Sequence, residues 1–422
     1  MQSVENIFSA VNETVEAERR EYATDTKPEP TPAPEPEPTT AENGAPLSFP
    51  VHIMRGAAGY FSDVMAGCME PPRHFFFLAY LTCLGNILQN TLKTELYPQG
   101  RLYTVILGAS ADDRKSTAIS KTVSFFLNTI SAFKACFGVG SAEGLQRRFL
   151  KDASDGTPSS VLLVFDELKA FVGKSKVDGS VLLPMVCTLF ETNRYESHTK
   201  DREIILTNAY LSILAASTIE TYERTWDSAF QDIGMTNRLF IVPGAGRRLH
   251  AIPGQVPGHE WGIMKSDLGK ILRVALMTPE LEITPAARAL YEAWYFNLEQ
   301  SIHTKRLDTY ALRFMILLTV NAGKSEVDES TVQDVIDLMN WQLQARRLHD
   351  PIDADSAIAK IEEKIRRKLK GNPLTESELK RAVHYERGGI YVYQNAIKNL
   401  TNEKEIRFNK ITNKWERPFK CI

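Results

Sequence analysis

One loop, Gly108 to Thr117, holds the residues whose types and spacing best suit chemistry on phosphate groups. An apolar run, Val105 to Leu107, enters the loop, and Lys115-Ser116-Thr117 opens a segment with helical spacing. Backbone N–H groups at a helix N-terminus face an anion, a lysine supplies a positive charge, and a hydroxyl group holds Mg²⁺. The layout therefore predicts a phosphate-binding loop. The alternative is a strand–loop–helix connection that contains Lys-Ser-Thr and has a structural role only.

The loop departs from the usual phosphate-binding motif, G-x-x-x-x-G-K-[ST], at two positions. That pattern needs glycine at positions 109 and 114, where this chain has Ala109 and Arg114. Glycine is common in such loops because it adopts backbone conformations that other residues rarely do. If this loop binds a phosphate, its backbone must therefore surround the phosphate without those two glycines.

Two adjacent carboxylates, Asp166 and Glu167, follow a second apolar run, Val161 to Phe165. Five consecutive apolar residues predict a strand buried on both faces, as in a parallel sheet, whose carboxyl edge is where ligands bind. In a P-loop enzyme the first carboxylate holds Mg²⁺ and the second polarises the attacking water. The structural alternative is a core strand that ends in solvated acids. Because the pair follows the Lys-Ser-Thr loop by about fifty residues, the combination favours an ATPase.

Three further polar residues stand at predicted strand ends. The apolar strand Tyr210 to Ala216 ends at Ser217 and Thr218, and either hydroxyl can bond a γ-phosphate or the lytic water, or simply cap the next helix. Arg238 precedes a fifth strand near 239–243. An arginine there can stabilise charge on a transferring phosphoryl group, often across a subunit boundary, or be an ordinary surface charge.

The elements that must position these residues alternate between strands and helices over 100–243, which predicts a mostly parallel α/β sheet. The run from Phe75 to Leu88 is apolar almost all round, so we expect a buried helix there. Residues 284–350 show helical periodicity without strand signals. We therefore expect an α/β core over 49–250 and a helical subdomain over 251–350.

The two ends of the chain differ from this core. Residues 1–48 combine a short amphipathic helix with a Pro/Glu/Thr tract that predicts an extended linker, so the helix is either a docking peptide for a protein partner or a fraying tail. Residues 355–422 predict three short helices and a hairpin, which is the winged-helix plan. Residues 356–422 hold 16 Lys and Arg against 8 Asp and Glu, whereas the whole chain has a net charge of −2. This asymmetry favours contact with DNA, although winged helices also dock proteins.

Composition excludes several classes of protein. The chain has 422 residues, enough for two or three domains, and its most apolar runs are too short to span a bilayer. Its five cysteines are scattered singly, without the spacing of a zinc site or a disulfide framework. We therefore expect a cytoplasmic protein that does not enter the membrane.

The order of these pieces resembles the helicase-like P-loop ATPases of phage and mobile-element primase–helicase proteins, a family often described only as a domain of unknown function. The resemblance covers about Phe49 to Arg347. It is carried by Gly-x-Ser-x-x-x-Arg-Lys-Ser-Thr at 108–117, Ser-x-Glu-Gly-Leu at 141–145, the strand ending in Asp166-Glu167, Ser212-Ile213 leading to Ser217-Thr218-Ile219-Glu220, and Gly-x-x-x-Arg-Leu-Phe at 234–240. In that family an arginine often precedes the loop lysine, so Arg114 matches the family's form of the motif.

The resemblance implies a RecA/AAA-like P-loop ATPase core with ATP and Mg²⁺ as cofactors. The nucleotide-binding residues that it implies are Gly108, Ser110, Arg114, Lys115, Ser116 and Thr117. The metal-binding residues are Ser116, Thr117 and Asp166. The catalytic residues are Glu167, Asp166, Thr218 and Arg238, the last acting on the nucleotide of a neighbouring subunit.

The expected function is that of an ATP-driven, helicase-like DNA motor or loader in phage or mobile-element replication. Its partners would be single- or double-stranded DNA and further copies of the chain, with a hexameric ring as one arrangement. Two alternatives remain from the residues: an initiator or regulator whose nucleotide switches its assembly on DNA without processive unwinding, and a scaffold with a catalytically dead pocket.

Overall fold

The computed structural model describes residues 39–40, 46–109, 113–152, 159–177, 179–199, 202–226, 230, 233–350 and 357–418. The N-terminal helix, most of the linker and Ser110 of the loop lie outside these residues, so their predictions stay as they were. The described chain begins with a two-residue pairing of β1 (Thr39–Thr40) with β2 (Pro46–Leu47) and a single 3₁₀ turn, η1 (Val51–Ile53).

A five-stranded, entirely parallel sheet forms the centre of the protein, in the order β10-β4-β9-β6-β5. Its strands are β4 (Tyr103–Gly108), β5 (Ala135–Phe137), β6 (Ser159–Phe165), β9 (Ala209–Thr218) and β10 (Phe240–Pro243). Every residue of β4 is buried, as expected for a parallel strand covered on both faces. The predicted mostly parallel α/β sheet is confirmed.

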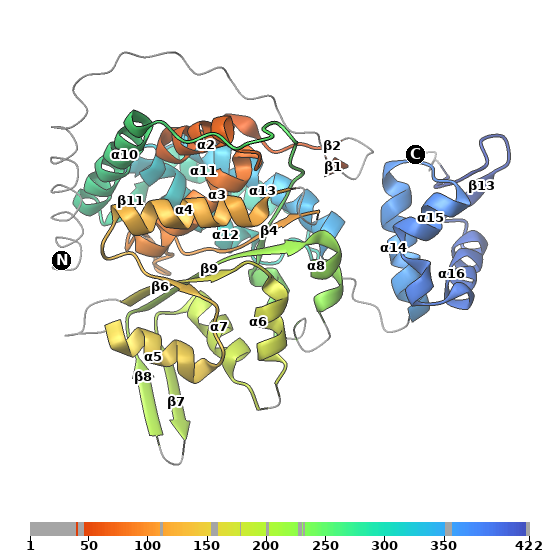
Figure 1. The fold of residues 1–422 in the computed structure, drawn as a ribbon, viewed down its shortest axis with the longest axis horizontal. Helices are drawn as coiled ribbons and strands as arrows, with labels where there is room; N and C mark the ends of the chain where they lie inside the picture. Colours follow the sequence, from red (N-terminus) through yellow and green to blue (C-terminus); the bar gives the residue numbers. More distant parts are fainter. Residues whose placement is uncertain are drawn as a thin grey trace.

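Helices cover both faces of this sheet, as Figure 1 shows. One face carries α2 (Gly56–Cys68), α3 (Arg73–Ile87), α4 (Lys115–Thr129) and α10 (Gly258–Met277). The other face carries α5 (Ala142–Asp152), α6 (Leu168–Ser175) and α7 (Leu182–Glu191). Helix α3 is the apolar helix expected from the sequence, and it is buried on all sides from Phe75 to Leu84.

The helical layer continues the same hydrophobic core. After α10 come α11 (Pro285–Phe296), α12 (Leu307–Asn321) and α13 (Glu329–His349), whose apolar residues belong to one cluster with those of the sheet. Buried Asn321 ties α12 to α2, because its Oδ1 accepts from the backbone N–H of Ala58 at 2.7 Å and its Nδ2 donates to the carbonyl of Arg55 at 2.7 Å. None of the helices in the described ranges is both long and apolar enough to cross a membrane.

Two smaller sheets extend the core. Strands β3 (Thr91–Leu92), β11 (Glu280–Ile283) and β12 (Glu326–Val327) pair in the order β12-β11-β3. A hairpin of β7 (Tyr195–Thr199) and β8 (Arg202–Leu206) projects away from the main sheet (Figure 1). Strand β8 ends before Asn208, which takes the left-handed conformation at φ 54°.

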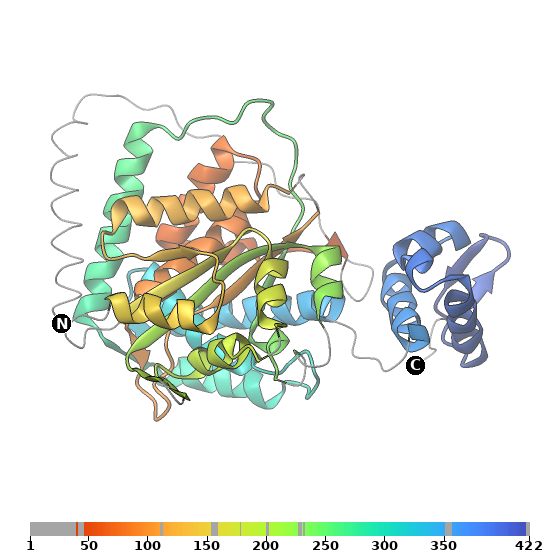
Figure 2. The ribbon, with the colours of Figure 1, turned by 60° about the horizontal axis from the view of Figure 1, so that its bottom comes forward.

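The C-terminal residues form a body with its own core (Figure 2). It contains α14 (Ala357–Gly371), α15 (Glu376–Ala382), the 3₁₀ turn η3 (Tyr385–Arg387), α16 (Ile390–Asn402) and a hairpin of β13 (Arg407–Asn409) with β14 (Lys414–Glu416). A capping box starts α15, with Thr375 and Glu378 bonding each other's backbone N–H groups. The predicted sequence of three helices and a hairpin is confirmed.

Candidate functional site

The carboxyl edge of the main sheet brings most of the expected site residues together. In the register of the sheet, Gly108 at the end of β4 lies opposite Thr218 at the end of β9, and Phe165 at the end of β6 lies opposite Ala215. The loop that follows β4 and the two carboxylates that follow β6 therefore meet at one edge. Strand β9 lies between β4 and β6 in the sheet, so Ser217, near the end of β9, lies between the loop and the two carboxylates.

Lys115 is the first residue of α4, and its side chain turns back into the loop. Its Nζ donates to the carbonyl of Gly108 at 3.2 Å and to that of Ala109 at 2.5 Å, and only 8% of the residue is exposed. Burial lowers the pKa of Lys115, while the charges of Asp113 and Glu167 act in the opposite direction. The ammonium therefore lies within the electrostatic reach of Glu167, a residue of another element.

Arg114 shows how the loop closes without its usual glycine. The residue has φ 48° and ψ 33°, the left-handed conformation that glycine adopts without strain. Its guanidinium points to Glu70, with Nε 2.9 Å from Oε2, and this pairing holds the pKa of Glu70 below its usual value. Glu70 also accepts from the backbone N–H groups of Leu249 at 3.2 Å and His250 at 3.4 Å. Arg114 thus lines the loop with its backbone, while its side chain is held by other parts of the fold.

Asp113 closes the loop from the inside. Its carboxylate is buried and accepts from the backbone N–H of Ala109 and, at 2.6 Å, from that of Gly246. A Cβ atom at Gly108 would come within 2.5 Å of the Asp113 carboxylate, so only glycine fits at the start of the loop. Neither Asp113 nor Glu70 was predicted as a site residue from the sequence. The sequence does contain one clue to Asp113, because an acidic residue is unexpected inside a loop that is predicted to bind anions.

The two carboxylates after β6 lie in different surroundings. Asp166 is exposed, and its carboxylate makes no hydrogen bond or ion pair with the described residues. Glu167 is half-buried and accepts a hydrogen bond from the hydroxyl of Ser217 at 2.9 Å. Thr218 instead caps α8 (Ile219–Thr225), since its hydroxyl accepts from the backbone N–H of Thr221 at 3.1 Å. Of the two hydroxyls that the sequence offered, Ser217 is the one that contacts Glu167.

The donors available for a magnesium ion are a hydroxyl and a carboxylate. Ser116 is exposed and Thr117 is half-buried at the start of α4, and Asp166 follows β6 at the same edge of the sheet. Among the described residues, no group of three or more His, Cys, Asp or Glu side chains is placed to hold a metal ion. This donor set fits Mg²⁺ bound together with a nucleotide, because Mg²⁺ usually takes one or two protein oxygens, substrate phosphates and water.

Arg238 lies apart from the other expected site residues. It precedes β10, whose first residue, Phe240, pairs with Thr104 near the start of β4. Arg238 is therefore at the amino edge of the sheet, roughly 15–20 Å from the loop, given about 3.3 Å per strand residue. Its Nη1 donates to the carbonyls of Ile233 at 2.9 Å and Gly234 at 3.0 Å, and its Nη2 lies 3.2 Å from Glu191. Its side chain is only 11% exposed.

Neither a protein-family model nor a curated protein matches this chain. The functional interpretation accordingly depends on the geometry of Lys115, Asp166, Glu167 and Ser217 at the carboxyl edge of the sheet.

Proposed function

We propose that this protein binds and hydrolyses ATP at the carboxyl edge of its sheet, as a RecA/AAA-like P-loop ATPase. The observation that carries the proposal is the convergence of Lys115 and Glu167. One follows β4, the other follows β6, and Ser217 of the strand between them bonds Glu167. A buried ammonium opposite an oriented carboxylate is the arrangement needed to bind a terminal phosphate and direct a water molecule towards it.

Each residue of this edge has a distinct role in the proposed reaction. Lys115 exchanges its two carbonyl partners for the β- and γ-phosphate oxygens, and the N–H groups at the start of α4 bind the same phosphates. Ser116 or Thr117 together with Asp166 would hold Mg²⁺, which would neutralise charge developing on the phosphates. Glu167 polarises the attacking water, while Ser217 fixes the orientation of its carboxylate.

The position of Arg238, at the amino edge of the sheet, supports the proposal that copies of this chain assemble into oligomers. At the amino edge of the sheet it is too far from the loop of its own chain to touch a γ-phosphate there. It would reach a nucleotide only when a second copy presents its carboxyl edge, and Arg238 would then exchange Glu191 for phosphate oxygens. This geometry favours a homo-oligomer, for which a hexameric ring is one solution.

The C-terminal body supports a role on DNA. We propose that its three helices and hairpin act as a winged helix, whose third helix, here α16, would enter the major groove of a duplex. Its 16 basic against 8 acidic residues over 356–422 suit contact with phosphates. We therefore propose a helicase-like motor or loader in phage or mobile-element replication. The alternative, a nucleotide-switched initiator or regulator without unwinding, is favoured by the internal pairing of Arg238 with Glu191, since that pairing must change on assembly.

One set of assays separates these two functions. If the protein is a DNA motor, we expect DNA to stimulate ATP hydrolysis and the two strands of a forked duplex to separate in the presence of ATP. The regulator predicts nucleotide-dependent binding to DNA with no strand separation. Removal of residues 357–422 is expected to lower duplex affinity and the salt dependence of binding, because the basic module is removed. Unchanged duplex binding after this deletion would refute the DNA-binding role of the module.

The Ser217–Glu167 contact makes a further prediction about turnover. Ser217→Ala is expected to lower kcat about tenfold with little change in nucleotide affinity, because a hydrogen bond to a charged group contributes roughly 1.5 kcal/mol or more. The matched variant Thr218→Ala removes a helix cap and is expected to lower the free energy of unfolding by about 1 kcal/mol. Steady-state kinetics and thermal unfolding of both variants provide the measurement. A larger loss of kcat in Thr218→Ala than in Ser217→Ala would contradict the assignment.

A further inference from the structure

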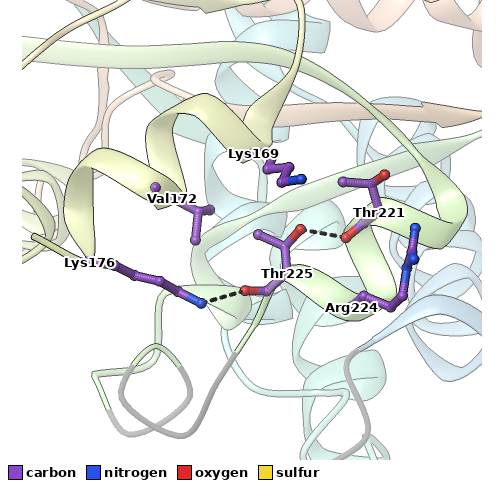
Figure 3. Close-up of a pocket in the computed structure, with 7 residues that line it drawn as sticks. Lys169, Val172, Lys176, Thr221, Arg224 and Thr225 are labelled. Atoms are coloured by element: carbon purple, nitrogen blue, oxygen red, sulfur yellow. Dashed lines mark hydrogen bonds between the residues drawn. The ribbon is translucent and has the colours of Figure 1, made fainter. Parts of the chain in front are cut away.

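A pocket of about 360 Å³ opens between α6 and α8, beside the proposed nucleotide site (Figure 3). Helix α6 begins immediately after Glu167, and α8 begins immediately after Thr218. The walls of the pocket are thus two helices that start at the ends of β6 and β9. Its lining residues are Lys169, Val172, Gly173 and Lys176 on one side and Thr221, Arg224 and Thr225 on the other.

The pocket is strongly basic. Three of its seven described lining residues are cations, and none is a carboxylate. Lys169 is exposed, extends from α6 towards α8, and makes no ion pair or hydrogen bond with the described residues (Figure 3). Lys176 donates to the carbonyl of Thr225 at 3.0 Å, which joins the two walls. Arg224 bonds the carbonyl of Glu220, and the Glu220 carboxylate, 3.8 Å away, offsets part of its charge.

The other lining groups point to the kind of anion that fits. Val172 lines the pocket but is only 1% exposed, whereas Gly173 is exposed, and among the described residues no atom beyond the adjoining backbone of its own helix lies within 4 Å of where its Cβ would be. The Thr225 hydroxyl is engaged with the carbonyl of Thr221 at 2.5 Å, which leaves the cations as the main donors. A bare inorganic anion would use the cations only. A phosphodiester also carries sugar surface that would contact the exposed backbone at Gly173.

We propose that this pocket binds a backbone phosphate of single-stranded DNA. The proposal rests on the proposed function for the choice of DNA as the polyanion. A flexible single strand can direct one phosphate between two helices, and single-strand sites are typically positively charged grooves that follow the backbone, whereas the stiff duplex follows such a groove less readily. Single-stranded DNA would thus bind at α6 and α8, and duplex DNA at the C-terminal module.

The position of the pocket also links DNA to the hydrolytic residues. A phosphate held by Lys169 on α6, by Lys176 immediately after α6 and by Arg224 on α8 would draw together the two helices that follow Glu167 and Ser217. The hydrogen bond between Glu167 and Ser217 spans the same two elements. Binding of a single strand is therefore expected to favour the orientation of Glu167 that turnover requires.

The test compares the affinity of the full-length protein for labelled oligo-dT and for a duplex of equal length, by fluorescence anisotropy at several salt concentrations and without nucleotide. Lys169→Gln and Lys176→Gln are expected to weaken single-strand binding about threefold each and about tenfold together. The plot of log affinity against log salt concentration should become shallower by about 0.7 for each DNA phosphate that the variant no longer neutralises. Lys174→Gln is the matched control, because Lys174 lies on the same helix, is exposed and does not line the pocket.

Three results would overturn the proposal: unchanged oligo-dT affinity in the double variant, an equal loss in Lys174→Gln, or an equal loss for duplex DNA. Displacement of oligo-dT by inorganic phosphate at matched ionic strength would overturn it as well, since the pocket would then be a site for small anions. These binding measurements need no ATP hydrolysis, so they stand if the ATPase proposal fails. A chain that hydrolyses ATP and binds oligo-dT equally well in every variant would refute the pocket alone.

Discussion

Lys115→Ala is expected to weaken ATP binding about tenfold to a hundredfold and to remove measurable hydrolysis, because a hydrogen bond to a charged group contributes roughly 1.5–3 kcal/mol and each 1.4 kcal/mol is tenfold in affinity. In the structure the Lys115 ammonium is buried in the loop, and its hydrogen-bond partners among the described residues are the carbonyls of Gly108 and Ala109. Those carbonyls carry no full charge, so the ammonium is available to a phosphate. Isothermal titration with ATP and Mg²⁺ measures the change.

The fold should tolerate this substitution. Ala109 is exposed, so its carbonyl can bond water once the ammonium is gone, and α4 keeps its apolar contacts with the core. Lys121→Ala is the control, because Lys121 lies on the same helix and is exposed to solvent. Wild-type ATP affinity in Lys115→Ala would show that the loop is structural only.

Glu167→Gln is expected to leave ATP binding intact and to lower kcat by about a hundredfold to a thousandfold, within the range of general base catalysis. Glutamine keeps the shape of the side chain and can still accept the hydrogen bond from Ser217 through its amide oxygen. It cannot take a proton from water. Single-turnover hydrolysis beside equilibrium nucleotide binding separates the two effects.

Asp166→Asn should behave differently from Glu167→Gln. The exposed Asp166 carboxylate is proposed to help hold Mg²⁺, so its loss should raise the magnesium concentration needed for half-maximal turnover. If Glu167→Gln hydrolyses ATP as fast as the wild type, the water-activating role of Glu167 is wrong. If both variants show only a changed magnesium requirement, the two carboxylates act together on the metal.

The sequence predicted the elements that carry strong local patterns. The buried strands before Gly108 and Asp166 and the all-apolar helix α3 each leave a signal in adjacent residues. Because parallel strands end at the same edge, the meeting of the loop with the two carboxylates also followed from the sequence. The structure adds the strand order, which places β9 and Ser217 between them.

Other features depend on contacts between residues far apart in the chain, so no local pattern reveals them. Glu70 meets Arg114 across 44 positions, and Asp113 meets Gly246 across 133 positions. These contacts are how the loop closes although Arg114 replaces the usual glycine. The placement of Arg238 is similar, since only the register of β10 with β4 shows that it stands at the opposite edge of the sheet. The basic pocket likewise requires α6 and α8 to be side by side.

The most direct test of the account is the release of inorganic phosphate from ATP by the purified wild-type chain, followed with and without Mg²⁺ and beside Glu167→Gln. If ATP is hydrolysed at this site, phosphate release is steady and depends on magnesium, and Glu167→Gln abolishes it while still binding ATP. Release that is absent from the wild type across a range of protein and DNA concentrations, or that persists unchanged in Glu167→Gln, would contradict it.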